Sequence, residues 1–450
     1  MDSYFTDASG YTGTADKVFT PETEAEVAAI LREATAERIP VTISGAGTGL
    51  TGGRVPNGGW VVSLERLNGI EIYPGYAICG AGALLRDLQA AAAPARQFYA
   101  PDPTEWGASL GGTVATNASG SRSFRYGDTR RHLRAARVLL MSGESLVLRR
   151  GEKPPFELPT LPAPATNKNT AGYFLRPDMD YLDLFVGSEG TLGVVTQVEL
   201  GLLPAPDSLF TGVVFFDSDA AALEAVDAWR PVPALRMLEY IDAASLDLLR
   251  PRFPEIPAEG RAALLIEQEA AKGEDAEEAW IERLEASAAL LEASWFATSA
   301  ADRERFRRFR HAVPEAVNDL VRHNNLAKMG SDFAVPIAQN EAMLRVYREA
   351  LDRNFPGRYV IFGHIGDAHL HVNILPANDD EWQRGKQLMM EFARRAVEMG
   401  GTVSAEHGLG KLKRYLLPIQ FTPEQIETMK RVKAQFDPRN LLGRGTLFPD

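Results

Sequence analysis

The sequence contains little cysteine and no long apolar stretch. Cys79 is the single cysteine among 450 residues, which excludes an internal disulfide framework and a cysteine-rich metal site. We expect Cys79 to be a buried small hydrophobic residue. No apolar run approaches the roughly 20 residues that a membrane-spanning helix needs, and the N-terminus lacks the basic and then apolar stretch of a signal peptide. These absences predict a soluble, cytoplasmic protein without a transmembrane segment.

An excess of positive charge is also absent. The chain has 48 lysines and arginines against 60 aspartates and glutamates, a formal net charge of −12. Nucleic-acid binders gain most of their affinity by neutralising phosphates, so this charge argues against a nucleic-acid partner. Hydrophobic residues make up 45% of the chain and charged residues 24%, as in ordinary globular proteins. The length predicts two or three domains, each with its own core.

The first part of the chain is dense in glycine and predicts short strands and helices. Thr20 before Pro21 is the expected N-cap of a helix over 21–38. Strands are expected at 41–43 and 60–64, a helix at 84–93, and a hairpin of 138–141 with 145–148. The proline-rich segment 151–164 predicts a loop.

The pattern changes at 204–206, where we place the first domain boundary. Strands are expected at 212–216, 235–240 and 262–268, and helices at 219–229, 276–291 and 341–354. This alternation predicts a sheet covered on one face by helices, in an α+β or α/β domain. The chain divides into residues 1–206, 207–420 and 421–450, and the last part holds one amphipathic helix and an irregular tail.

A predicted strand leads directly into a glycine cluster at 45–53. Gly47, Gly49 and Gly52 have the spacing of the dinucleotide-binding fingerprint. That fingerprint requires a helix directly after its glycines, whereas a proline-containing turn follows here. The cluster is therefore interpreted as a loop whose successive backbone N–H groups line a site for an anion such as a phosphate.

Two further segments, 111–120 and 187–193, offer small residues and accessible backbone in the same way. Together the three segments predict one extended ligand that several loops contact. In order, they resemble the FAD-binding domain of the vanillyl-alcohol oxidase type of flavoprotein, most of all the branch that oxidises D-2-hydroxy acids (D-lactate, glycolate and D-2-hydroxyglutarate dehydrogenases). This resemblance implies an α+β fold with an FAD-binding domain and a cap domain whose antiparallel sheet is covered by helices. It also implies a C-terminal segment that packs back near the flavin.

The resemblance also implies which residues contact FAD. They are Ser44, Gly45, Ala46, Gly47, Thr48, Gly49 and Thr51 around the pyrophosphate, and Pro101, Ser109, Gly112, Asn117, Ser119, Glu189, Gly193 and Val194 along the rest of the cofactor. Ser44 stands where the family usually has arginine, and Ala46 where it usually has glycine. Thr48 stands where covalently flavinylated relatives carry the linking histidine, so we expect FAD to be bound non-covalently.

Four of the 7 histidines fall close together in the second half of the chain: His364, His369, His371 and His407. A turn centred on residues 367–368 is expected to make His364 and His371 cross-strand neighbours in a hairpin. Alternation along the second strand then places His369, His371 and Asn373 on one face, toward a cleft.

Glu406 and His407 follow an amphipathic helix that is expected to end at 400–401. Two histidines and one carboxylate form a ligand set for a divalent metal that keeps open positions for a substrate. The resemblance assigns a divalent metal to His364, His371 and Glu406, proton removal to His407, and substrate contacts to Arg310, Lys328 and Asn373. These ligands suit zinc, manganese and iron, and we expect zinc or manganese.

The chain departs from the branch at several of these places. Ala368 and His369 stand where the branch usually has glycine and asparagine. Pro314 stands where D-2-hydroxyglutarate enzymes carry threonine, which favours a smaller substrate such as D-lactate. Arg310 lies on an arginine-rich helix that is expected to end at His311.

The expected reaction is the FAD-dependent, metal-assisted oxidation of a D-2-hydroxy acid to the 2-keto acid, with hydride transfer to flavin N5. A histidine with an ordinary pKa near ~6.5 can accept the hydroxyl proton at neutral pH. The electron acceptor is open between a quinone, an electron-transfer flavoprotein, a partner subunit and oxygen, and a homodimer is left open.

Three other interpretations stay open from the sequence alone. One is a flavin oxidase that uses oxygen directly. A metal-dependent hydrolase would account for the histidines and the carboxylate but not for the glycine-rich segments. A non-catalytic nucleotide-binding module would account for the glycines but not for the histidines.

Overall fold

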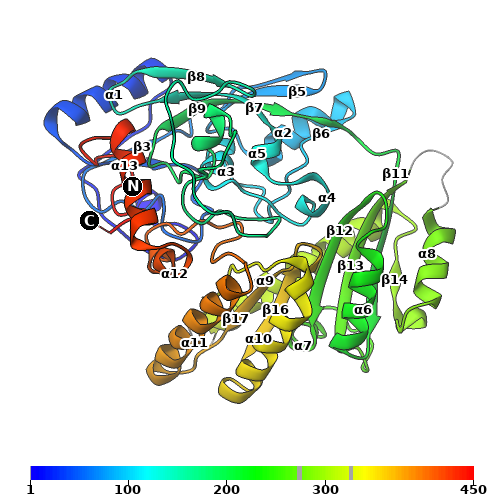
Figure 1. The fold of residues 1–450 in the computed structure, drawn as a ribbon. Coiled ribbons are helices and arrows are strands. Elements are labelled where there is room, and N and C mark those ends of the chain that lie inside the picture. The colour runs from blue at the N-terminus through cyan, green and yellow to red at the C-terminus, as the bar shows by residue number, and fades with distance from the viewer. Residues whose placement is uncertain (1, 271–275, 324–327, 450) are drawn as a thin grey trace.

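The protein, here a computed structural model, is described over residues 2–270, 276–323 and 328–449. It has two lobes (Figure 1). One lobe combines the early strands with the C-terminal helices, and the other is built around one large sheet. Across the described ranges, no helix combines the length and the apolar character needed to cross a bilayer.

The first lobe holds two larger sheets and a short ribbon. A parallel sheet has the order β1-β3-β2, and an antiparallel sheet has the order β4-β5-β9-β7-β8. The strands of this lobe are β1 (Lys17–Phe19), β2 (Val41–Ser44), β3 (Trp60–Ser63), β4 (Ile70–Tyr73), β5 (Tyr76–Gly80), β7 (Leu133–Leu139), β8 (Ser145–Arg149) and β9 (Val194–Gly201), with β6 (Gln97–Phe98) and β10 (Leu203–Pro204) in the ribbon. Its short helices are α2 (Leu85–Ala92), α4 (Ser123–Tyr126) and α5 (Thr129–His132).

Helix α1 (Glu24–Glu37) begins later than the sequence predicted. Its N-cap is Thr23, whose hydroxyl accepts the backbone N–H of Glu26 at 3.2 Å, so the expected cap at Thr20 is wrong. The first backbone N–H groups of a helix have no partner within the helix, and an N-cap side chain accepts one of them. Thr23 lies directly before the helix and does this. Glu24 then accepts Nε and Nη2 of Arg137, both at 2.7 Å, and fastens α1 to β7.

The second glycine-rich segment is a helix, not the loop that the sequence predicted. Helix α3 (Leu110–Thr116) is capped at its C-terminus by Asn117, which has a left-handed φ of 51°. A Cβ on Gly111 would lie 2.6 Å from the Cβ of Ala81. The small residues therefore allow α3 to pack directly against the chain that follows β5.

The second lobe is an antiparallel sheet in the order β14-β11-β13-β12-β16-β17-β15. Its strands are β11 (Ser208–Phe216), β12 (Leu235–Asp242), β13 (Ala262–Ala270), β14 (Trp295–Phe296), β15 (Met329–Gly330), β16 (Tyr359–His364) and β17 (His369–Ile374). Its helices are α6 (Asp219–Trp229), α7 (Ala243–Leu249), α8 (Ala276–Glu285), α9 (Ala300–His323), α10 (Asn340–Asn354) and α11 (Asp379–Glu398).

Helices cover both faces of this sheet, whereas the sequence predicted one covered face. Helices α6, α10 and α11 lie in front of the sheet in Figure 1, and α7 and α9 pack on the other side. Successive residues of a strand point to opposite faces. Val213 and Phe215 accordingly enter one core, and Val214 and Phe216 enter the other. The middle of β11 is apolar on both sides, so both faces must be covered.

Two helix ends differ from the sequence prediction. Helix α9 continues through His311 and Pro314 to His323, because Phe306, Phe309 and other apolar side chains at helical spacing stay buried on both sides of the proline. Helix α8 ends at Glu285, since the following chain turns to the sheet edge, where Ala289 forms a bridge with Phe216.

The C-terminal segment returns to the first lobe. Helices α12 (Leu417–Gln420) and α13 (Pro423–Phe436), red in Figure 1, lie against that lobe. Nζ of Lys433 donates to the carbonyl of Thr191 at 2.9 Å, and Leu442 forms a parallel bridge with Val41. The segment therefore supports both the strand that leads into the first glycine cluster and the turn at 187–193.

Candidate active site

A cavity in the first lobe is lined by the three small-residue segments. Among the residues implied as FAD contacts, these line it: Gly45, Ala46, Gly47, Thr48, Gly49, Thr51, Ser109, Gly112, Ser119, Glu189, Gly193 and Val194. Ser44, Pro101 and Asn117 are buried outside that lining. The Asn117 amide donates to Asp128 at 2.7 Å and accepts the backbone N–H of Arg130 at 3.0 Å, so it holds α3 against α5.

Arg54 places a positive charge beside the glycine loop. Its Nη1 donates to the carbonyl of Gly45 at 2.8 Å and to the hydroxyl of Ser44 at 3.2 Å, and its Nε donates to the carbonyl of Thr6 at 2.9 Å. A Cβ on Gly47, which has a φ of 83°, would lie 2.4 Å from Cζ of Arg54. Burial lowers the pKa of Arg54, but a guanidinium keeps its charge in proteins. The cavity is therefore lined both by accessible backbone and by Arg54, whose guanidinium donates to carbonyl and hydroxyl oxygens.

Glu189 ties the turn at 187–193 to the loop that carries Glu406 and His407. Its Oε1 accepts the backbone N–H of Leu409 at 2.9 Å, and its Oε2 accepts that of Gly410 at 2.7 Å. Burial raises the pKa of Glu189 to about 7. A Cβ on Gly408 would lie 2.7 Å from the Glu189 carboxyl carbon, so glycine allows this close contact between the lobes.

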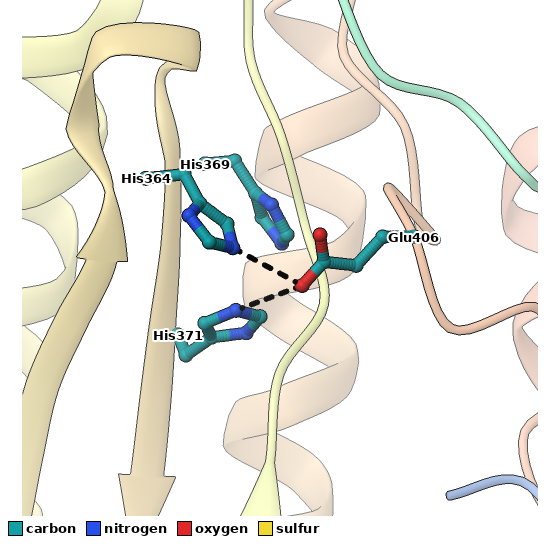
Figure 2. Close-up of side chains that lie close together, drawn as sticks. All are labelled: His364, His369, His371 and Glu406. Atoms are coloured by element: carbon teal, nitrogen blue, oxygen red, sulfur yellow. Dashed lines mark hydrogen bonds and ion pairs between the residues drawn. The ribbon is translucent and has the colours of Figure 1, made fainter. Parts of the chain in front are cut away.

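Three histidines come together in the β16–β17 hairpin (Figure 2). The register pairs His364 with His369, and Phe362 with His371, so the expected direct pairing of His364 with His371 is wrong. A tight turn at 365–367, followed by Ala368 with a φ of 51°, closes the hairpin between His364 and His369. The ring centroids of His364 and His371 are still only 5.6 Å apart.

The carboxylate of Glu406 completes the cluster. Its Oε1 lies 3.3 Å from Nε2 of His364 and 3.3 Å from Nε2 of His371. Its Oε2 accepts Oγ of Ser119 at 2.8 Å and Nζ of Lys168 at 3.0 Å, both from the first lobe. The three sequence-predicted ligands therefore meet at the boundary between the lobes. His369 joins them in a group whose ligand atoms all lie within 4.8 Å of one another.

Glu239 on β12 holds His364 from behind. Its Oε1 lies 2.6 Å from Nδ1 of His364, and its Oε2 accepts Nε of Arg310 at 2.9 Å. Burial alone would raise the pKa of Glu239, but the positive charges of His364 and Arg310 outweigh burial and lower it to about 2. Arg310, predicted as a substrate contact, is therefore already paired with a buried carboxylate.

Asp332, just after β15, organises the other side of the cluster. Its Oδ2 accepts the backbone N–H of His407 at 2.9 Å and Oγ of Ser404 at 2.8 Å. Its Oδ1 lies 3.1 Å from Nε2 of His369 and 3.4 Å from Nδ1 of His407. Burial would raise the pKa of Asp332, but the neighbouring histidines outweigh burial and hold it far below its ordinary value.

His407 connects the two parts of the site. Together with Glu406 it lines the same cavity as the glycine loop. Its ring stacks on that of His371, with centroids 5.4 Å apart and planes 18° apart. Burial lowers the pKa of His407, although Asp332 and Glu406 oppose that effect. The ring is therefore neutral, and able to accept a proton, at neutral pH.

The remaining predicted substrate residues lie in different surroundings. Asn373 is buried on β17, two positions after His371 and on the same face. Lys328 is exposed, and its ammonium donates to the side chain of Asn318. The structure thus brings Asn373 next to the histidine cluster, while Lys328 contacts the end of α9.

Four residues of the site were not predicted from the sequence: Arg54, Lys168, Glu239 and Asp332. Lys168, Glu239 and Asp332 reach the site through contacts between distant parts of the chain. Glu239 lies 125 residues from His364 in sequence, and Lys168 lies 238 residues from Glu406. Arg54 was the easiest of the four to predict from the sequence, because it directly follows the glycine cluster and arginine is well suited to binding a phosphate.

The comparisons with known proteins agree with this architecture. Residues 15–149 match the family described as FAD binding domain, and residues 205–447 match the family described as FAD linked oxidases, C-terminal domain. At 16% identity, a solved structure of alkyldihydroxyacetonephosphate synthase has the same fold, with a TM-score of 0.70 over 95% of this chain and 75% of that chain.

Curated relatives match over almost the whole chain. Glycolate oxidase subunit GlcD of Bacillus subtilis (strain 168) is 32% identical over 97% of this chain and 90% of the relative. D-lactate dehydrogenase of Anaerostipes hadrus is 32% identical over 94% and 87%. D-2-hydroxyglutarate dehydrogenase of Xanthomonas citri pv. viticola is 30% identical over 95% and 88%. The chain therefore belongs to the FAD-linked oxidase family of the vanillyl-alcohol oxidase type, and it is an FAD-dependent oxidoreductase.

Proposed function

We propose that this protein uses FAD to oxidise a small D-2-hydroxy acid, such as D-lactate, to the 2-keto acid, with a divalent metal assisting. The observation that carries the proposal is that Glu406 and His407 line the same cavity as the glycine loop. A metal-type cluster and a flavin-type cavity therefore share one space. Relatives named for glycolate, D-lactate and D-2-hydroxyglutarate support a 2-hydroxy acid as the substrate class.

The first lobe fits FAD. The glycine loop offers backbone N–H groups to a pyrophosphate, and the guanidinium of Arg54 offers positive charge beside them. Thr48 lines the cavity and has no ring nitrogen that could bond covalently to the flavin, which supports non-covalent binding. When bound, FAD supplies the two-electron acceptor that takes the substrate C2 hydride at flavin N5.

The histidine cluster fits a divalent metal, zinc or manganese. His364, His371 and Glu406 offer two imidazoles and a carboxylate, ligand types that suit such ions. Outer partners fix their directions, as in established metal sites: Glu239 holds His364, and Lys168 holds the far oxygen of Glu406. A metal bound there supplies a Lewis acid that lowers the pKa of the substrate hydroxyl.

His407 is the proposed general base. Its Nδ1 lies 3.4 Å from the buried carboxylate of Asp332, which leaves Nε2, 3.6 Å from Oε1 of Glu406, directed at the ligand cluster. The neutral ring accepts the hydroxyl proton at Nε2. The positive charge that results is balanced by Asp332, which stays ionised at neutral pH.

The charge arrangement favours a substrate with one carboxylate. Arg310 is paired with Glu239, so its charge is already balanced before a second carboxylate could reach it. Pro314 in the same helix offers no hydroxyl for such a group. Asn373 lies next to the cluster and is the proposed polar contact for the substrate.

Dye-coupled turnover by the FAD-loaded enzyme tests this function. D-lactate, L-lactate, glycolate and D-2-hydroxyglutarate are compared at equal enzyme and metal concentrations. We expect the highest kcat/KM with D-lactate and no turnover of L-lactate. Failure of the FAD-loaded enzyme to reduce the dye with all four acids would contradict a small D-2-hydroxy acid as the substrate.

A further inference from the structure

His369 is a fully buried polar side chain at the centre of the active site. Its exposed fraction is 0%. Neither ring nitrogen forms a well-aligned hydrogen bond with the described part of the chain, although Nε2 lies 3.1 Å from Oδ1 of Asp332. Buried polar atoms normally have a partner, and one that lacks it needs an explanation.

The ring of His369 extends toward the same place as the three proposed metal ligands (Figure 2). Its centroid lies 4.4 Å from that of His371 and 5.4 Å from that of His364. A ring nitrogen of His369 belongs to the group of four ligand atoms that all lie within 4.8 Å of one another. Strand alternation explains why His369 and His371 share a face, and the tight turn explains why His364 faces them.

We propose that His369 is a fourth protein ligand of the metal, which gives a site of three imidazoles and one carboxylate. The inference rests on the metal binding proposed above, and it goes beyond the ligand set of His364, His371 and Glu406. An unpartnered imidazole thereby obtains the partner that its burial requires. Asp332, whose Oδ1 lies 3.1 Å from Nε2 of His369, would then be an outer carboxylate of the site, as metal-binding histidines commonly have.

The fourth ligand has two chemical consequences. Imidazole suits zinc better than manganese, which prefers oxygen ligands, so a third histidine shifts the preference of the site toward zinc relative to manganese. Four protein ligands also fill a tetrahedral site, whereas a catalytic zinc site usually has three and keeps one position open. If four protein residues held zinc, a substrate oxygen would bind as an additional ligand and would not find an open position.

Metal binding is tested in the FAD-loaded protein without any substrate. Zinc affinity is measured by chelator competition for the wild type, His369→Asn and His369→Ala, and His323→Asn serves as an exposed histidine control. We expect both His369 variants to bind zinc at least about 10-fold more weakly, while His323→Asn stays unchanged. Flavin absorbance and melting temperature in the presence of chelator check that each variant is folded.

X-ray absorption at the zinc edge of the wild type gives a second measurement that needs no variant. We expect three imidazoles and one carboxylate around zinc, against two imidazoles if His369 only contacts Asp332. Two imidazoles, or unchanged zinc affinity in folded His369→Asn, would overturn the fourth ligand and leave the metal-assisted reaction in place. A wild type that binds no divalent metal would instead remove the metal from the proposed function as well.

Discussion

One buried carboxylate accepts the backbone N–H of His407 and also lies beside its ring. Oδ2 of Asp332 accepts the backbone N–H of His407 at 2.9 Å, and Oδ1 of Asp332 lies 3.4 Å from Nδ1 of its ring. Asp332 is fully buried, so its charge acts in a poorly screened environment. A negative charge therefore lies next to the His407 ring, which lines the cavity of the glycine loop.

Asp332→Asn is expected to lower kcat by about 10²–10⁴-fold, the usual range for general acid–base catalysis, with little change in KM. The amide keeps the size of the side chain but cannot balance the charge of a protonated His407. Steady-state kinetics and flavin absorbance measure the effect. Asp302→Asn, at an exposed site whose bonds go to Thr298 and Ser299, is the control. An Asp332→Asn enzyme with wild-type kcat would show that His407 does not need this carboxylate.

His407→Gln is expected to bind FAD normally and to lose flavin reduction by substrate. Glutamine fills similar space but cannot accept a proton at neutral pH. Stopped-flow spectroscopy under anaerobic conditions measures the reduction rate, and the flavin spectrum before mixing reports cofactor content. Reduction at the wild-type rate would remove His407 from the role of general base.

Arg54→Ala is expected to weaken FAD binding by roughly 10–100-fold, the range for losing a hydrogen-bonded charge. Arg54→Lys should lose less, because lysine keeps the charge but not the planar set of donors. Flavin fluorescence quenching in the apoprotein measures the dissociation constant. Arg66→Ala, which removes an exposed arginine paired with Glu22, should leave FAD affinity unchanged. Equal affinity in Arg54→Ala and the wild type would place the pyrophosphate elsewhere.

Glu239→Gln is expected to lower zinc affinity by about 10–100-fold, as the loss of an outer partner typically does. The substitution removes the charge that orients His364 and leaves Arg310 without its carboxylate. Chelator competition measures the affinity, with Glu255→Gln, which removes a surface partner of Arg305, as the matched control. If the two variants bind zinc equally well, Glu239 does not orient a ligand.

Cys79 is expected to resist thiol reagents in the folded protein. It is 1% exposed, and burial raises its pKa to about 12, so almost no reactive thiolate is present at neutral pH. Labelling should appear only as the protein unfolds in denaturant. Ser142→Cys, in the exposed turn of the β7–β8 hairpin, supplies a rapidly labelled positive control. Rapid labelling of native Cys79 would contradict its buried position.

Local patterns predicted much of the site because its motifs are continuous in sequence. The glycine cluster after β2 and the alternation in β17 depend on neighbouring residues, so the cavity-lining loop and the shared face of His369 and His371 follow from them. The hairpin register did not follow, because the turn at 365–367 and the left-handed Ala368 decide which residues pair. The alternation of side chains along a strand shows which residues share a face, but it does not determine how many residues form the turn and hence which residues pair.

Outer partners of the site could not be predicted in this way. Asp332 lies 75 residues before His407, and no local pattern distinguishes it from other aspartates. The helical state of 110–116 also followed from packing: Gly111 allows α3 to approach Ala81, and this contact outweighs the low helix propensity of glycine. In both cases the deciding interaction exists only in the folded chain.

A single anaerobic turnover is the sharpest test of D-2-hydroxy acid oxidation by this enzyme. FAD- and zinc-loaded enzyme is mixed with a small excess of D-lactate or L-lactate, and the flavin spectrum and keto acid are measured together. We expect D-lactate to bleach the flavin and to yield one pyruvate per FAD reduced, while L-lactate does neither. A flavin that stays oxidised with D-lactate, and with D-2-hydroxyglutarate and glycolate in parallel, would contradict D-2-hydroxy acid oxidation.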